Sequence, residues 1–294
     1  MFAAILLPAE KRCIDRAAHE ADQTAAHGPQ NGPFFGPFYG PLWASRGLFR
    51  LSSAGIIVVC RSRLIRSIQG FPMSGSSGRV IAVISQKGGA GKTTVAIQLG
   101  GGFHDIRASM VLIDLDPQES SFRWAESASL LDSDLQLDVR KMSGLELIKQ
   151  IAALQSEADY IVLDTPPSLT HPSTMAALAV AHLAIIPAVP GPTDLWSTLA
   201  VERLILNRIE QSHRLRGCIL PNRVQNTALA ADVLDLLKEF TLPVLDARLS
   251  QRNAYAQSAV VGASVFQLGA SADAAQQEVR KLIKAIREQL GETV

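Results

Sequence analysis

The chain contains little cysteine, few aromatic residues and no long apolar segment near its N-terminus. Its three cysteines, Cys13, Cys60 and Cys218, show no metal-binding spacing, and no C-x-x-C pair is present. This shortage argues against an iron–sulfur protein and fits a reducing, cytoplasmic location. The apolar stretch at 55–60 is far too short to span a bilayer.

A strong charge of either sign is also missing, because the formal net charge is +1 over 28 basic and 27 acidic residues. Residues 1–73 hold eight of the basic and four of the acidic side chains, so the rest of the chain is slightly acidic. Net charge therefore does not by itself indicate a DNA-binding protein. Arginines of the second half would still form a sequence-independent phosphate-binding surface if they converged on one face. These arginines are Arg203, Arg208, Arg214, Arg216, Arg223, Arg248 and Arg252.

The composition and the pattern of the chain predict an α/β protein. Hydrophobic residues make up 47% of the sequence, and strand patterns alternate with helical patterns over residues 79–290. This alternation predicts a doubly wound, mostly parallel sheet flanked by helices. Ser143 and Glu146 form a capping box for a helix that we expect to run to about Glu157. Gly100–Gly102 falls inside another expected helix, where each glycine costs about 1 kcal/mol relative to alanine. That helix is therefore either short or packed very closely against a neighbour.

The most informative stretch is Lys87–Thr94, which reads K-G-G-A-G-K-T-T. It follows an expected buried strand at 80–84 and precedes the expected start of a helix at 95–99. Glycines let backbone N–H groups approach phosphate oxygens, and the positive end of the helix dipole favours an anion there. In such a loop the second lysine reaches the β- and γ-phosphates and the first threonine holds Mg²⁺. The predicted nucleotide-binding residues are Gly88, Gly89, Ala90, Gly91, Lys92, Thr93 and Thr94.

This loop resembles the deviant Walker A motif of the ParA/MinD family of dimerising ATPases. The usual phosphate loop begins with glycine, but here that position is Gln86, and a second lysine, Lys87, follows it. In the family this first lysine crosses the dimer interface and touches the phosphates of the nucleotide held by the other subunit. The resemblance implies a P-loop NTPase fold, ATP hydrolysis with Mg²⁺, and catalytic roles for Lys87 and Lys92.

Two further segments resemble the family. The strand expected at 110–114 leads into D-L-D-P-Q at 114–118, and the strand expected at 160–164 leads into D-T-P-P at 164–167. The resemblance implies that Asp116 positions the attacking water, that Asp114 supports the Mg²⁺ shell, and that Asp164 contacts the ion through water. Taken alone, an Asp-Pro pair would only end a strand.

Weaker similarity covers the rest of residues 79–288. Asn222 stands at an expected strand end, where many relatives place an asparagine that reads adenine, although asparagine is also a common turn residue. The stretch at 248–266 is similar to the closing segment of small, plasmid-type ParF-like proteins, which lack an N-terminal helix-turn-helix domain.

The first 72 residues do not share this pattern. Gly-Pro pairs recur every four residues from Gly28 to Pro41, which opposes both helix and sheet. Met73, followed by a few polar residues, has the form of a natural start. We therefore expect a ParA-type domain over 73–294, preceded by a segment that is either an annotation artefact or a disordered extension.

An apolar stripe marks the expected C-terminal helix at about 274–290. Its members are Val279, Leu282, Ile283, Ile286 and Leu290. A helix docked on the sheet has this pattern, and so does a MinD-like membrane anchor. We favour docking, because the stripe lacks bulky aromatic residues.

The sequence therefore predicts a cytoplasmic, nucleoid-associated ATPase that dimerises around two ATP–Mg²⁺. In its ATP state it would bind DNA non-specifically and drive plasmid or chromosome partition. A ParB-like, centromere-binding partner would stimulate hydrolysis. Two alternatives remain open: a membrane-cycling positional regulator of the MinD type, and an ATPase subunit of a secretion, conjugation or cellulose-synthesis system.

Overall fold

A seven-stranded parallel sheet forms the centre of the protein. The computed structural model describes residues 77–129 and 137–293. The sheet order is β3-β2-β4-β1-β5-β6-β7, and every neighbouring pair is parallel. The strands are β1 (Arg79–Val83), β2 (Met110–Asp114), β3 (Asp138–Lys141), β4 (Tyr160–Asp164), β5 (Leu183–Ala188), β6 (Arg216–Val224) and β7 (Leu249–Ser250). This arrangement confirms the predicted P-loop NTPase fold.

Strands β1 and β4 lie side by side at the point where the winding of the chain reverses. From β1 the chain crosses over β4 to reach β2, and from β4 it crosses over β1 in the opposite direction to reach β5. In open parallel sheets a ligand crevice opens at the carboxyl ends of the two strands at such a point. The phosphate loop follows β1 and Asp164 ends β4, so the fold brings these two motifs together.

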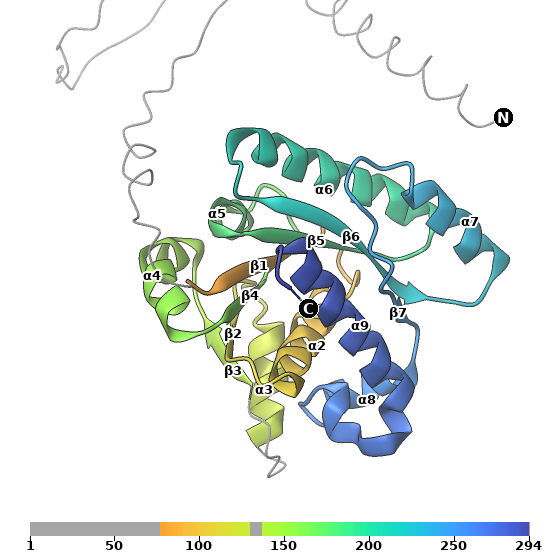
Figure 1. The fold of residues 1–294 in the computed structure, drawn as a ribbon, viewed down its shortest axis with the longest axis horizontal. Coiled ribbons are helices and arrows are strands. Elements are labelled where there is room, and N and C mark those ends of the chain that lie inside the picture. Colours follow the sequence, from red (N-terminus) through yellow and green to blue (C-terminus); the bar gives the residue numbers. More distant parts are fainter. Residues whose placement is uncertain (1–76, 130–136, 294) are drawn as a thin grey trace, which may run out of the picture. The chain divides into compact units, whose positions relative to one another are not determined.

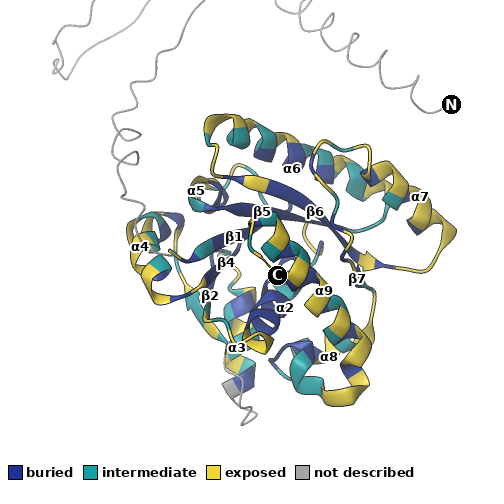
Figure 2. Ribbon diagram, viewed as in Figure 1, coloured by how far each residue is buried: buried dark blue, intermediate teal, exposed yellow. Residues whose placement is uncertain are grey.

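Helices cover both faces of the sheet (Figure 1). One core joins the sheet to α2 (Lys92–Asp105), α8 (Asn253–Val260) and α9 (Asp273–Gln289). The other joins it to α4 (Gly144–Glu157), α5 (Pro172–Val180), α6 (Pro192–Gln211) and α7 (Ala228–Leu237). Helix α3 (Ser120–Ser129) and the 3-10 helix η2 (Val265–Ala272) lie beside α2. Strands β1, β2, β4, β5 and β6 are mostly buried, whereas the edge strand β3 is partly exposed. The outer sides of α4, α6 and α7 are also exposed (Figure 2).

The three glycines of α2 are explained by close packing, because the helix continues through them to Asp105. A Cβ atom added at Gly101 would lie 2.1 Å from the Ser264 hydroxyl oxygen, and one added at Gly102 would lie 2.5 Å from Ile283. No side chain larger than hydrogen fits there without movement of η2 or α9. The low helix propensity of the three glycines is therefore offset by close contacts of α2 with its neighbours.

Helix α9 is docked on the sheet rather than free. Its apolar stripe is buried, with Val279, Leu282, Ile283 and Ile286 at 2% exposure or less. The docking interpretation of this stripe is confirmed, and the stripe is not available as a membrane anchor. Among the described residues no helix has both the length and the apolar character needed to cross a bilayer.

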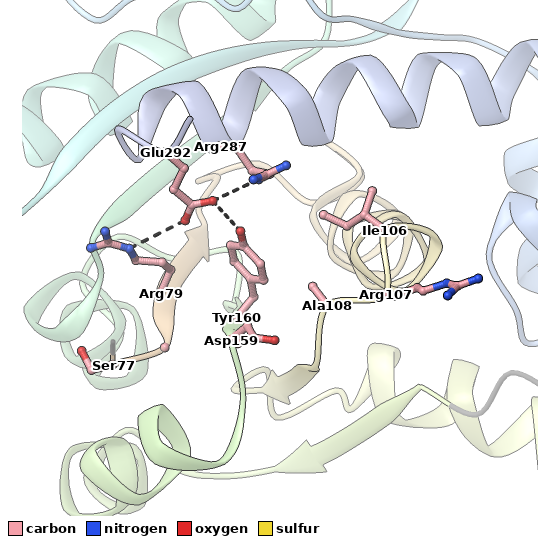
Figure 3. Close-up of a pocket in the computed structure, with 10 residues that line it drawn as sticks. Ser77, Arg79, Ile106, Arg107, Ala108, Asp159, Tyr160, Arg287 and Glu292 are labelled. Atoms are coloured by element: carbon pink, nitrogen blue, oxygen red, sulfur yellow. Dashed lines mark hydrogen bonds and ion pairs between the residues drawn. The ribbon is translucent and has the colours of Figure 1, made fainter. Parts of the chain in front are cut away.

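A cluster of polar side chains ties α9 to the amino-terminal ends of the central strands (Figure 3). Glu292, just after α9, accepts a hydrogen bond from the Tyr160 hydroxyl at 2.6 Å and pairs with Arg287 at 3.1 Å. Its other oxygen lies 3.7 Å from Arg79. Burial and the Glu292 carboxylate raise the pKa of Tyr160 to about 12. These contacts line a cleft of about 500 Å³ at the sheet edge opposite the predicted motifs.

The interpretation of residues 1–72 as an artefact or an extension lies outside the described residues. The domain boundary at 73 therefore stays a proposal.

Candidate nucleotide-binding site

The phosphate loop joins β1 to α2 in the expected strand–loop–helix order. Gly89 and Gly91 have φ values of 80° and 87°, a backbone region that suits glycine. Gly91 is the N-cap of α2 and has no side chain to cap the helix, so the first amides of α2 remain available to an anion. A Cβ added at Gly88 or Gly89 would meet nothing within 4 Å, so the loop backbone is open to a ligand.

Two predicted magnesium-site residues meet directly. The Thr93 hydroxyl donates a hydrogen bond of 2.8 Å to the Asp164 carboxylate. Ser121, at the start of α3, donates to the same oxygen. Burial raises the pKa of Asp164 to about 6, and these two hydrogen bonds act in the opposite direction. A carboxylate held this deeply is stabilised by a cation nearby, so the residue set fits a Mg²⁺ ion that Thr93 and Asp164 would help to hold.

Asp114 and Asp116 organise the loop after β2. Asp114 accepts hydrogen bonds from the backbone amides of Asp116 and Phe122, both at 3.0 Å. Burial raises the pKa of Asp114, and these amide bonds oppose the rise. Asp116 is half-buried and accepts a bond from the Gln118 amide. Its charge acts on Lys92 of the phosphate loop. The role of Asp116 in positioning the attacking water stays a prediction.

The two lysines of the loop have different surroundings. Lys92 is 7% exposed, and burial lowers its pKa, whereas the charges of Asp164 and Asp116 raise it. Lys87 is half-exposed and turns to α6, where its ammonium lies 2.7 Å from the Asp194 carboxylate. Lys92 therefore belongs to this chain's own site, and Lys87 is held outside it.

Asn222, in β6, holds the phosphate loop through a hydrogen bond. Its amide donates a hydrogen bond of 2.8 Å to the Ala90 carbonyl, and the residue is 3% exposed. A Cβ added at Gly91 would come within 2.4 Å of this amide, so glycine is needed there for space as well as for backbone conformation. The predicted contact of Asn222 with adenine is untested, and the structure gives the residue a second role as a loop support.

Two clefts open at the carboxyl edge of the sheet, next to these motifs. One of about 340 Å³ includes Asp114, Asp116 and Lys141, and one of about 710 Å³ includes Gln225, Arg248 and Arg252. In the described residues no three His, Cys, Asp or Glu side chains are grouped to hold a metal ion by themselves. A magnesium ion here would complete its shell with phosphate oxygens and water.

The seven arginines considered for DNA binding do not converge on one face. Arg214 and Arg216 lie at the amino edge of the sheet, because they immediately precede or begin β6. Arg223, Arg248 and Arg252 lie near the ends of β6 and β7, at the carboxyl edge. The remaining two, Arg203 and Arg208, are on α6.

Two site residues were missed by the sequence reasoning, namely Ser121 and Asp194. Ser121 follows the Asp-Pro-Gln segment as the second residue of α3, and a serine in a first helical turn gives no distinctive signal. Asp194 lies in the first turn of α6 after Gly191-Pro192, which does mark a helix start. Its contact with Lys87, however, spans 107 residues and depends on the tertiary fold.

Comparison with known proteins finds a nucleotide-binding family and similar chains. The family model described as the CobQ/CobB/MinD/ParA nucleotide binding domain matches residues 81–265. "Maintenance of carboxysome distribution protein A" of Halothiobacillus neapolitanus is 27% identical over 215 residues, covering 73% of this chain and 99% of that protein. "Chromosome-partitioning ATPase Soj" of Thermus thermophilus is 33% identical over 187 residues, covering 53% of this chain and 74% of that protein.

A solved structure shares the fold. The ATP complex of McdA from Cyanothece superposes with a TM-score of 0.58 at 19% identity, covering 75% of this chain and 99% of that chain.

Proposed function

Because this chain belongs to the CobQ/CobB/MinD/ParA family of nucleotide-binding domains, we propose that it is an ATPase that dimerises around two ATP–Mg²⁺ and then binds DNA non-specifically. A ParB-like partner would accelerate hydrolysis and so release the dimer from DNA. The protein would act in the cytoplasm, on the nucleoid. The observation that supports this proposal most is the direct contact between Thr93 and Asp164 beside a loop that carries two lysines.

The residues of the site suit phosphoryl transfer to water, which depends on positioning and on charge stabilisation. Lys92 and the amides of the phosphate loop would bind the β- and γ-phosphates. Asp116 would orient the attacking water, and Asp114 would keep the loop after β2 in place. Bound Mg²⁺, held by Thr93 and Asp164, would neutralise phosphate charge.

Lys87 would act on the nucleotide of the other subunit. Its ammonium contacts Asp194 rather than the carboxylates of its own site, and it remains half-exposed. A cation supplied across an interface stabilises transition-state charge as an arginine finger does. Because ATP would bridge the interface and ADP would not, the difference in affinity would drive the switch between monomer and dimer.

The DNA surface is proposed at the carboxyl edge. Arg248 and Arg252 line the larger cleft there, and Arg223 lies close by at the end of β6. Arg252 pairs with Glu278, and all three arginines are exposed. Arginines that contact phosphates would give salt-dependent binding without sequence preference.

The cargo would be a plasmid or a chromosome, as in partition ATPases. A second candidate is a protein body, because the alignment with the carboxysome distribution protein extends over 99% of that relative. In both cases the ATPase cycle is the same, and only the partner that stimulates hydrolysis differs.

Binding of the full chain to an arbitrary DNA duplex with ATP, with ADP and without nucleotide tests this function. The same measurement on Lys87→Gln and Asp116→Ala would separate the role of Lys87 across the dimer interface from the role of Asp116 in hydrolysis. Lys149→Gln on α4 is the matched control for an exposed lysine. We expect DNA binding only with ATP, lost in Lys87→Gln and retained in Lys149→Gln. We expect Asp116→Ala to retain DNA binding and to lose ATP hydrolysis.

The opposite result is equally informative. If the chain dimerises with ATP and binds no DNA, this ATPase acts on a protein or a membrane instead of DNA. A chain that binds ATP without dimerising would overturn the switch itself.

A further inference from the structure

The cleft at the amino edge of the sheet holds a carboxylate of the chain itself. This carboxylate belongs to Glu292, and one of its oxygens accepts hydrogen bonds from the Tyr160 hydroxyl at 2.6 Å and from Arg287 at 3.1 Å (Figure 3). We propose that the cleft is a binding site for a small carboxylate ligand, and that Glu292 occupies the place of the ligand's acid group. This inference goes beyond the proposed ATPase function and does not depend on it.

Glu292 leaves part of this site unused. Its second oxygen lies 3.7 Å from the Arg79 guanidinium, which is beyond hydrogen-bond distance. That guanidinium donates no hydrogen bond to any of the described residues, and the Arg79 side chain is 42% exposed. An arginine binds a carboxylate most strongly through two parallel hydrogen bonds. A free carboxylate, which no backbone tethers, could approach Arg79 more closely than Glu292 does.

The end of α9 explains why Glu292 reaches no further. The helix ends in a Schellman motif, in which Gly291 has a φ of 77° and its amide donates to the Glu288 carbonyl at 3.0 Å. The Glu292 amide donates to the Arg287 carbonyl at 2.9 Å. An apolar contact frequently joins these two positions of the motif, and here an ion pair replaces it. The helix end therefore fixes where the Glu292 side chain lies.

The size and the walls of the cleft suit a ligand that joins a carboxylate to a short apolar body. Its volume is about 500 Å³, and pockets for small molecules have volumes of roughly 300–1,000 Å³. Ile106, which is 41% exposed, and Ala108 line the side of the cleft that faces the Tyr160 ring (Figure 3). These groups would cover a ring or a short alkyl chain while the arginines hold the acid.

The charges around the cleft favour an anion once Glu292 is displaced. Three arginines and two acids line it, and the second acid, Asp159, already accepts hydrogen bonds from the amide and the hydroxyl of Ser109. The Arg107 guanidinium points away from Glu292 (Figure 3), so the other two arginines would hold the ligand. Burial and the Glu292 carboxylate raise the pKa of Tyr160 to about 12, so its hydroxyl keeps the proton that it donates.

Binding of benzoate to the full chain, measured by ligand-observed NMR titration, tests the inference. Glu292→Gln removes the competing charge and keeps the size of the side chain. We expect this variant to bind benzoate with a Kd on the order of 1 mM, at least about fivefold more tightly than wild type. Benzamide, the uncharged counterpart of benzoate, should not bind. Glu288→Gln removes an exposed acid outside the cleft and should bind benzoate as weakly as wild type does.

Two further measurements place benzoate in the cleft. Arg79→Gln, added to Glu292→Gln, should abolish the gain in affinity, because it removes the donors that Glu292 leaves unused. In protein labelled with ¹³C-tyrosine, the Tyr160 signal should shift when benzoate is added to Glu292→Gln, and Tyr160→Phe assigns that signal. Urea denaturation of each variant checks that the fold is retained.

Three results would overturn the site. They are equal benzoate affinity in Glu292→Gln and wild type, benzoate binding that survives Arg79→Gln, and a Tyr160 signal that does not move. Each would show that Glu292 only holds the end of α9 on the sheet. None of them bears on ATP-dependent dimerisation or DNA binding, so the proposed function would stand.

Discussion

The Lys87 ammonium lies 2.7 Å from the Asp194 carboxylate, although the two residues are 107 positions apart. The pair joins the phosphate loop to the start of α6 within one chain. It occupies the lysine that would otherwise be free to cross to a partner. Asp194 is mostly buried, with 13% of its side chain exposed, so the pair is better protected from solvent than an ordinary surface ion pair.

Removing the Asp194 charge should therefore make dimerisation easier. Ion pairs that are partly exposed contribute up to about 1 kcal/mol. If this contact must break when Lys87 crosses to the partner, Asp194→Asn should tighten the ATP-dependent dimer by about two- to fivefold. Sedimentation equilibrium with a non-hydrolysable ATP analogue measures the change. A dimer that is weaker in Asp194→Asn would show that Asp194 supports the interface instead.

Asn222 should matter for nucleotide binding through the loop that it supports. Asn222→Ala leaves the buried Ala90 carbonyl without its donor, at a cost of about 1–3 kcal/mol. We expect the affinities for ATP and ADP to fall together by about tenfold, because both nucleotides need the same loop. Calorimetric titration measures both, with Asn226→Ala as the exposed control. Asn222→Asp, which keeps the size and loses the donor, should be at least as weak. A loss confined to one nucleotide would contradict the role as a loop support.

The sequence predicted the parallel sheet and most of its motifs for a physical reason. Phosphate loops and the strands before them are local patterns. Strand β1 appears at the apolar run before the phosphate loop, and β2 and β4 appear at the apolar runs that end in Asp. The contacts of Ser121 with Asp164 and of Asp194 with Lys87 could not be predicted, because each joins residues far apart in the sequence. Asn222 was found as a strand-end polar residue, but its partner Ala90 lies 132 positions away.

The sequence leaves two explanations open for the glycines of α2, and the structure decides in favour of close packing. The contacts of these glycines lead to a stability prediction. Helix propensity alone favours Gly102→Ala by about 1 kcal/mol. A Cβ there would lie 2.5 Å from Ile283 and 2.9 Å from Val279, so overpacking should win and destabilise the fold by about 1–3 kcal/mol.

Urea denaturation of the full chain measures the loss for Gly102→Ala. The double variant with Ile283→Ala provides the control. Shortening Ile283 removes the nearest atoms, so the added Cβ should cost less in that background than in the wild type. Equal costs in the two backgrounds would show that contact with α9 is not what excludes a side chain at Gly102.

His182 should make the stability of the protein depend on pH. Its Nδ1 accepts a hydrogen bond of 2.9 Å from the Val80 amide, so the ring is neutral. Burial lowers the pKa of His182 to about 4, and the nearby charges of Arg214 and Arg79 act in the same direction. Between about pH 6.5 and pH 4 the unfolded chain therefore binds a proton that the folded chain does not. Stability contributed by His182 is present above pH 6.5 and is lost as the pH falls towards 4, by on the order of 2–3 kcal/mol.

His182→Asn isolates this contribution, because the asparagine oxygen can accept the same bond from Val80 and does not titrate. Urea denaturation at pH 7 and pH 5 should show a smaller loss of stability in His182→Asn than in wild type. Carboxylates that titrate in the same range affect both proteins equally, so the difference between them belongs to the histidine. His213→Asn, which removes an exposed histidine, should lose as much stability as wild type between the two pH values. If His182→Asn and wild type lose stability in parallel, the imidazole is not the group that responds to acid.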